Sequence, residues 1–263
     1  MASGARWRGL GTGSSVSARR RAIQASDVLP DEVYLRERAE FVAEATAALR
    51  DSCRTLRNSL EVEWTVSGLL AAWGDFADSD RIQESGREFV DALEEAGDGS
   101  ALVMLRGFDA VAQGPLRQAA TEAAARLAKR GLTPPRRMQH VGHAKATRAW
   151  TMGERSAAEG IGVMIEYEYP DHERHTVAGY VADYLGGIVK FISLTSGLDH
   201  LARDAGAVPV PVPEASAVLR AALAATEPRE RPPGEDGVRK LGALAWSRVV
   251  AARVEAAGPE AAT

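Results

Sequence analysis

Side chains that can exchange protons lie between residues 166 and 183 of this 263-residue chain. Glu168 and His175 flank a short polar segment, and Asp183 follows eight residues after His175. A carboxylate beside an imidazole can accept and donate protons near neutral pH. Glu168, His175 and Asp183 are therefore the candidate catalytic residues, and they make a hydrolase or a metal-dependent enzyme one alternative function.

A β-hairpin is the element that must position these residues. Residues 161–169 alternate between apolar and other side chains, which is typical of a strand with one apolar face. Residues 170–173 have the composition of a turn, and residues 174–184 form the return strand. We expect the turn to place Tyr169 opposite Arg174.

This register predicts which side chains share a face. Glu168 would lie opposite His175, and Glu166 and Asp183 would lie on the same face. An extended strand separates His175 from Asp183 by roughly 26 Å. The residues therefore cannot form one site unless the sheet bends sharply, and the Glu168–His175 pair is equally explained as an ordinary cross-strand contact.

Two histidine pairs have a spacing that metal sites also use, namely His140 with His143 and His172 with His175. Neither pair matches a helical metal pair or a Cys/His zinc pattern. The chain also lacks a Gly-x-Ser-x-Gly elbow, a phosphate-binding loop and a strand-to-helix dinucleotide fingerprint. We expect no metal and no cofactor.

A basic run occupies residues 117–148, where eight Lys and Arg residues accompany a lone acid, Glu122, although the whole chain has a net charge of −4. Clustered cations attract phosphate backbones, so this run predicts a nucleic-acid interface as a second alternative. An ordinary helix end explains Lys129 and Arg130 equally well. The candidate nucleic-acid-binding residues are Arg117, Arg126, Lys129, Arg130, Arg136 and Arg137.

Helical periodicity dominates the chain before residue 131. Apolar residues recur at spacings of three, four and seven, which predicts five short helices with a break at each Gly- or Pro-rich turn. We expect Ser100 to cap the fourth helix, and Gly114 with Pro115 to open the fifth. The expected helices cover residues 30–56, 60–73, 79–93, 100–111 and 114–127.

The fold class predicted from these patterns is α+β. A helical region at 26–131 precedes an antiparallel β-meander region at 132–206, whose strands span about residues 148–194, and C-terminal helices follow at 207–257. Residues 26–257 can form one domain. We expect residues 1–25, rich in Gly, Ser and Arg, to be a disordered tail, and residues 258–263 a second tail.

Composition limits the cellular compartments in which we expect the protein. No run approaches the roughly 18 apolar residues of a membrane-spanning helix, so we expect no membrane partner. Cys53 is the single cysteine, which excludes an internal disulfide. Its position on an apolar helical stripe predicts a buried hydrophobe and not a reactive thiol. A reducing cytoplasm fits these properties.

The second half of the hairpin region carries a further motif of unknown role, Asp183, Gly186, Gly187 and Lys190. With the helices before it and the segment Tyr169-Pro170-Asp171, this motif resembles a family of uncharacterised proteins from high-GC bacteria. The resemblance covers roughly residues 60–225 and implies a bacterial, intracellular protein without an assigned activity. Such proteins tend to have an acid after the lysine, where this chain has Phe191.

The sequence therefore predicts, as its leading function, a non-enzymatic protein-interaction or regulatory module. The predicted apolar sheet must be covered by helices or by an unknown protein partner. Nucleic-acid binding through the basic run and hydrolysis or metal-dependent chemistry around His175 are the alternatives.

Overall fold

Helices of the N-terminal half occupy the places that the periodicity predicts. The computed structural model describes residues 31–74, 79–153, 160–196, 206–226 and 236–256. The tails at 1–25 and 258–263 lie outside the described residues. The five helices are α2 (Asp31–Ser52), α3 (Ser59–Gly74), α4 (Ser79–Ala96), α5 (Gly99–Val111) and α6 (Gly114–Lys129).

The start of α5 differs from the prediction. Asp98, and not Ser100, is the N-cap, because its Oδ1 accepts a hydrogen bond from the backbone N–H of Ala101 at 2.8 Å. The other carboxylate oxygen of Asp98 accepts from the Arg50 guanidinium of α2. The cap thus also joins α5 to α2. Gly131 has a φ of 86° just after α6, which confirms the predicted helix end.

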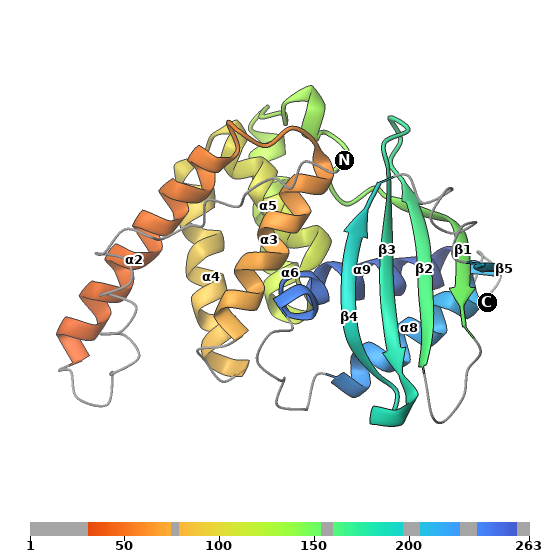
Figure 1. The fold of residues 1–263 in the computed structure, drawn as a ribbon. Helices are drawn as coiled ribbons and strands as arrows, with labels where there is room; N and C mark the ends of the chain where they lie inside the picture. The colour runs from red at the N-terminus through yellow and green to blue at the C-terminus, as the bar shows by residue number, and fades with distance from the viewer. Residues whose placement is uncertain (1–30, 75–78, 154–159, 197–205, 227–235, 257–263) are drawn as a thin grey trace, which may run out of the picture.

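A five-stranded antiparallel sheet follows, so the predicted α+β class is confirmed (Figure 1). The strands are β1 (Lys145–Met152), β2 (Gly160–Glu168), β3 (Arg174–Ala182), β4 (Ile188–Thr195) and β5 (Val208–Val210). Their spatial order is β4-β3-β2-β1-β5, and the first four strands form the expected meander. The short edge strand β5, which contains Pro209, was not predicted.

The register of the β2–β3 hairpin differs by one residue from the expected one. Tyr167 lies opposite His175, and Glu168 lies opposite Arg174. The turn closes one residue earlier than expected, since the N–H of Tyr169 donates to the carbonyl of Glu173. A one-residue shift moves a side chain to the other face of the sheet. The predicted Glu168–His175 pairing is therefore wrong.

Helices α8 (Val212–Thr226) and α9 (Asp236–Ala256) cover one face of the sheet (Figure 1). This face contributes Val163, Ile165 and Val177 to a continuous hydrophobic core that also includes Leu219 of α8 and Leu244 of α9. The same core extends into the N-terminal helices. Cys53 is buried within it, as predicted, and burial raises the pKa of its thiol to about 12.

Helices α3 and α5 approach closely at Gly107. A Cβ at this position would lie 2.8 Å from Cγ2 of Val66 and 3.1 Å from Cγ1 of Val62. Both valines are fully buried, and β-branched side chains have little rotameric freedom in a helix. The absence of a side chain at residue 107 therefore sets the distance between the two helices.

We predict that Gly107→Ala destabilises the protein by up to about 2 kcal/mol, because overpacking costs about 1–3 kcal/mol and the better helix propensity of alanine offsets about 1 kcal/mol of this cost. Gly242→Ala in α9 is the matched control, since a Cβ there meets nothing within 4 Å. It should stabilise by up to about 1 kcal/mol. Urea unfolding measures both changes, and equal effects would contradict the packing argument.

Candidate functional site

Four elements bring polar side chains together in the core, and we call Glu63, Tyr167, Tyr169, His175 and Arg248 the Glu63 cluster. Glu63 comes from α3, His175 from β3 and Arg248 from α9. The hydroxyl of Tyr169 donates to Oε2 of Glu63 at 2.7 Å, and Nη2 of Arg248 donates to the same hydroxyl at 2.8 Å. Nη2 also contacts Oε2 of Glu63 directly, which forms an ion pair.

Aromatic rings enclose the Arg248 guanidinium. Its Cζ lies 5.6 Å from the ring centroid of Tyr167 and 5.6 Å from that of Tyr169. His175 stacks on Tyr167 with ring centroids 5.6 Å apart and an interplanar angle of 18°. The rings present their faces to the cation, which adds a favourable cation–π interaction.

Burial fixes the protonation states in the Glu63 cluster. Glu63 is 0% exposed and Arg248 is 3% exposed. Burial lowers the pKa of Arg248, but the combined effect of Glu63, Tyr169 and Tyr167 outweighs it, so the pKa is raised and the guanidinium stays charged. Burial lowers the pKa of His175 to about 3, and the positive charge of Arg248 acts in the same direction. His175 is therefore neutral at pH 7.

The tautomer of His175 follows from its neighbour. Nε of Arg248 donates to Nε2 of His175 at 3.4 Å, so the ring proton lies on Nδ1. Nδ1 of His175 and the hydroxyl of Tyr167 have no hydrogen-bond partner among the described residues. Burial raises the pKa of the Tyr167 hydroxyl. A protonated His175 would place an N–H donor against the donor of Arg248, which is a further reason for the neutral form.

The Glu63 cluster contains a carboxylate and an imidazole, the side chains that acid–base sites use. Its charged groups, however, are buried in the core, away from solvent. Glu63 and Arg248 are not among the residues that the sequence patterns identify as candidates. Each lies on the apolar stripe of its helix: Glu63 is three residues before Val66, and Arg248 is four residues after Leu244. A charged residue on a buried stripe was the signal that could have identified the pair.

The predicted catalytic residues lie in different environments. Glu168 is at the hairpin end, where its carboxylate accepts from Nδ1 of His172 and from Nε of Arg174, each at 2.7 Å. The hydrogen bond from His172, followed by that from Arg174, lowers the pKa of Glu168. His175 is in the core, on the opposite face from Glu168. Asp183 is in the 3₁₀ helix η3 (Asp183–Leu185), beyond the end of β3.

The other proton-exchanging groups do not converge with His175 either. Glu166 pairs with Arg148 of β1, with Oε2 and Nη2 2.7 Å apart. His172 is exposed at the turn, whereas His175 is buried. Within the described part of the chain, no group of three or more His, Cys, Asp or Glu residues has an arrangement suited to a metal ion.

Several cations of the basic run contact groups of the protein itself. Nη2 of Arg126 donates to Glu94 of α4 at 2.7 Å, and Arg117 lies 3.5 Å from Asp109. Arg137 donates to the carbonyl of Leu56 at 2.9 Å. The remaining candidates of the run, Lys129, Arg130 and Arg136, lie at or after the end of α6. Internal ion pairs thus neutralise part of the charge of the run.

The motif of unknown role forms a tight connection between β3 and β4. Gly186 and Gly187 have φ values of 82° and 75°, a left-handed conformation that glycine adopts at no steric cost because it has no Cβ. Lys190 interrupts the β3–β4 register as a bulge. Its Nζ donates to the hydroxyl of Tyr184 at 3.0 Å and lies 5.7 Å from the centre of that ring.

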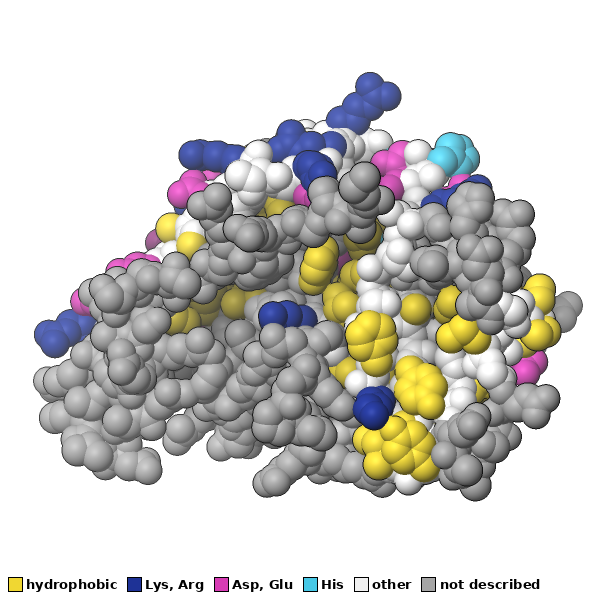
Figure 2. All heavy atoms as spheres, viewed as in Figure 1, with side chains coloured by type: hydrophobic (Ala, Val, Ile, Leu, Met, Phe, Trp, Pro, Cys, Tyr) yellow, Lys and Arg dark blue, Asp and Glu magenta, His cyan; other side chains and the backbone are white. Residues whose placement is uncertain are grey.

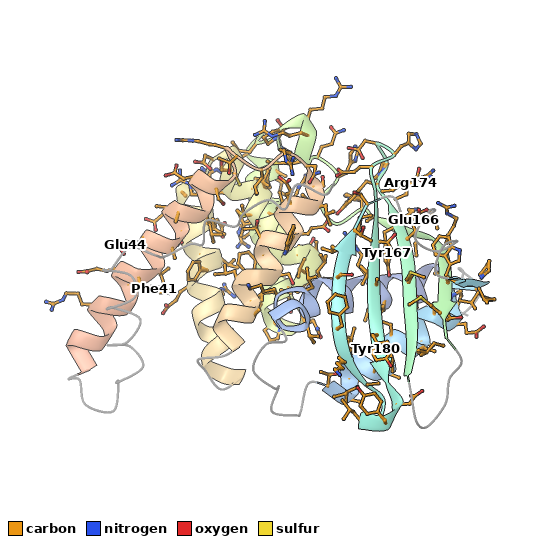
Figure 3. All side chains as sticks on the ribbon, viewed as in Figure 1. Phe41, Glu44, Glu166, Tyr167, Arg174 and Tyr180 are labelled. Carbon is orange, nitrogen blue, oxygen red and sulfur yellow. The ribbon has the colours of Figure 1, made fainter. Side chains whose placement is uncertain are left out.

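Apolar side chains lie in this connection and on the adjoining sheet face opposite α8 and α9. We call Tyr180, Tyr184, Leu185 and Phe191, together with Lys190, the aromatic patch. Phe191 is 57% exposed, Tyr184 46% and Leu185 40%. Phe191 lies opposite Tyr180 across the β3–β4 pair. Figure 2 shows apolar side chains gathered over the lower part of the sheet with dark blue Lys or Arg atoms among them, and Figure 3 labels Tyr180 there.

These features define an α+β protein with an enclosed ionic cluster and an exposed aromatic patch. No family model, curated protein or solved structure matches the chain. None of the described helices is both long and apolar enough to cross a membrane.

We predict that His175 makes the protein sensitive to acid. Its pKa is about 3 when folded and 6.5 ordinarily, so between these values the unfolded chain binds a proton that the folded protein does not. Stability due to His175 is therefore complete above pH 6.5 and falls as the pH decreases. Between pH 6.5 and 4, the wild type should lose about 3 kcal/mol more than His175→Gln, which retains an acceptor for Arg248 but cannot titrate.

Urea unfolding at the two pH values measures this difference. Other titrating groups change equally in both proteins, so only the difference between them reports on residue 175. Parallel losses in the wild type and in His175→Gln would show that residue 175 is not a buried neutral histidine.

Proposed function

We propose that this protein is a non-enzymatic interaction module that binds a protein partner through the aromatic patch. The observation that supports this function is the exposure of Phe191 on one sheet face together with Tyr184 and Leu185 in the adjoining connection η3, while helices cover the other face. Grouped exposed apolar side chains are typical of binding surfaces, and aromatic residues supply much of the energy of such interfaces.

The partner that fits the aromatic patch is a protein segment with apolar side chains and a carboxylate. The apolar groups would cover Phe191 and Leu185, and the carboxylate would lie near the ammonium group of Lys190. A second copy of the chain fits less well. In a symmetric dimer the same patch meets itself, and the five residues of the patch include no carboxylate that could pair with Lys190 of the other copy.

We expect the partner to bind to the face of the sheet and not to its edges. At the β4 edge, the N–H of Val189 donates to the hydroxyl of Thr226 at 2.9 Å, and the Lys190 bulge interrupts the strand. At the other edge, β5 has three residues and contains Pro209. Charged residues, bulges, prolines and short strands all discourage the addition of a further strand.

The alternative functions have less support among the described residues. A hydrolase built on Glu168, His175 and Asp183 would need residues that lie on different faces and elements to act together. A nucleic-acid interface on the basic run would have to compete with the contacts that Arg117, Arg126 and Arg137 make within the protein.

Tyr184→Ser/Phe191→Ser tests the proposal, and Val208→Ser is the matched control because Val208 is also exposed but lies on β5 at the other edge of the sheet. Both variants change exposed side chains, so unfolding free energies should stay within about 0.5 kcal/mol of the wild type. The full-length proteins are immobilised and exposed to extract of the native cell. We expect proteins that the wild type and Val208→Ser retain to be lost from the double variant.

Each retained protein is then purified and its affinity measured directly. Lys190→Glu should weaken binding at least tenfold if the partner contributes a carboxylate. Equal retention by the double variant and the wild type, or no retention by the wild type, would refute the proposal. Concentration-dependent dimerisation abolished by the double variant would instead identify a second copy as the occupant and overturn the partner named above.

A further inference from the structure

We propose that Glu63, Tyr167, Tyr169 and His175 form a guanidinium-binding site in the core and that Arg248 of α9 is its built-in ligand. These four residues come from α3 and the β2–β3 segment, whereas the guanidinium comes from α9. The residues that form the site therefore come from α3 and the sheet, and the group that fills the site comes from the C-terminal helix α9. This inference does not depend on the function of the aromatic patch.

The geometry of the site matches a guanidinium and not merely a positive charge. Nη2 of Arg248 donates to Glu63 and to the Tyr169 hydroxyl, and Nε donates to Nε2 of His175. A guanidinium presents such donors in a fixed planar fork, whereas the ammonium group of lysine is a compact point charge on a flexible stem. A lysine at residue 248 could not reproduce both the spread of donors and the flat contact with the rings.

The rings complete the recognition. Tyr167 and Tyr169 each hold their centroid 5.6 Å from Cζ of Arg248, so the cation is enclosed by two faces as well as by acceptors. A weakly hydrated planar cation gains more from such faces than a strongly hydrated ammonium. The same enclosure keeps water from the ion pair, since Glu63 and Arg248 are almost fully buried.

Contacts outside α9 hold the site in place. The N–H of Gly142 donates to Oε1 of Glu63 at 2.7 Å, which leaves Oε2 for the ligand and for Tyr169. The hairpin register places Tyr167 opposite His175. Because these contacts do not involve residue 248, removing its side chain should leave a polar cavity whose donors and acceptors are already arranged. A preorganised site binds a small ligand at low entropic cost.

Full-length Arg248→Ala tests the proposal by chemical rescue. Truncation leaves Glu63 buried without a counter-ion, so the melting temperature should fall strongly. Methylguanidinium chloride at millimolar concentration should restore at least half of this loss, and the recovery should grow with the logarithm of its concentration. Methylammonium chloride at equal concentration controls for salt, and it should restore little.

Two further variants test whether the site recognises the guanidinium group itself or only its positive charge. Arg248→Lys retains a cation, yet its melting temperature should fall nearly as far as that of Arg248→Ala. Glu63→Gln/Arg248→Ala lacks the buried carboxylate and should not respond to methylguanidinium. Equal rescue by both salts, a wild-type melting temperature for Arg248→Lys, or an undiminished response of the double variant would overturn the proposal.

A measurement on the wild type covers the case in which Arg248→Ala does not fold. In nitrogen-15 spectra, a guanidinium held by several acceptors rotates slowly and its side-chain N–H protons exchange slowly with water. The signal assigned to Arg248 should show both properties, and Glu63→Gln should abolish them. A freely rotating, rapidly exchanging Arg248 guanidinium in the wild type would refute the site by itself.

Discussion

The ion pair between Glu63 and Arg248 connects the main parts of this protein. It joins α3 of the helical half to α9, and its hydrogen bonds to Tyr169 and His175 attach both helices to the sheet. A buried ion pair adds little net stability compared with a well-packed apolar pair, but removal of one partner costs about 3–5 kcal/mol. Alternative placements of α9 would leave one of these charges buried alone. Packing α9 where Arg248 meets Glu63 avoids that cost.

A second buried contact supports the same placement. The hydroxyl of Ser67 donates to the carbonyl of Lys240 at 2.7 Å and accepts from the N–H of Leu244 at 3.1 Å. With α9 and α8 fixed over one face of the sheet, Trp150 and Met164 form a smaller apolar cluster on the other face. Tyr180 and Phe191 of the aromatic patch lie on that second face. Its exposure is thus a consequence of which face the C-terminal helices cover.

Local patterns predicted most of the elements because they depend on neighbouring residues. Gly114 with Pro115 and Gly131 set the two ends of α6, and alternation identified β2 and β3. Two details were predicted wrongly, one at a residue that also makes a distant contact and the other at a local turn. Asp98 caps α5 while it pairs with Arg50, which lies 48 residues earlier. The hairpin register depended on which backbone groups closed the turn, and composition does not distinguish closures that differ by one residue.

The sequence by itself determined the α+β class, the order of the elements and the burial of Cys53, because hydrophobic periodicity and turn residues act over short distances. Only the tertiary structure decided the chemistry of the interior. Glu63 and Arg248 are 185 residues apart, so no local pattern pairs them. His175 is similar: its type suggested acid–base chemistry, but burial beside Arg248 keeps it neutral. The protonation state of a group depends on its surroundings, and folding creates those surroundings.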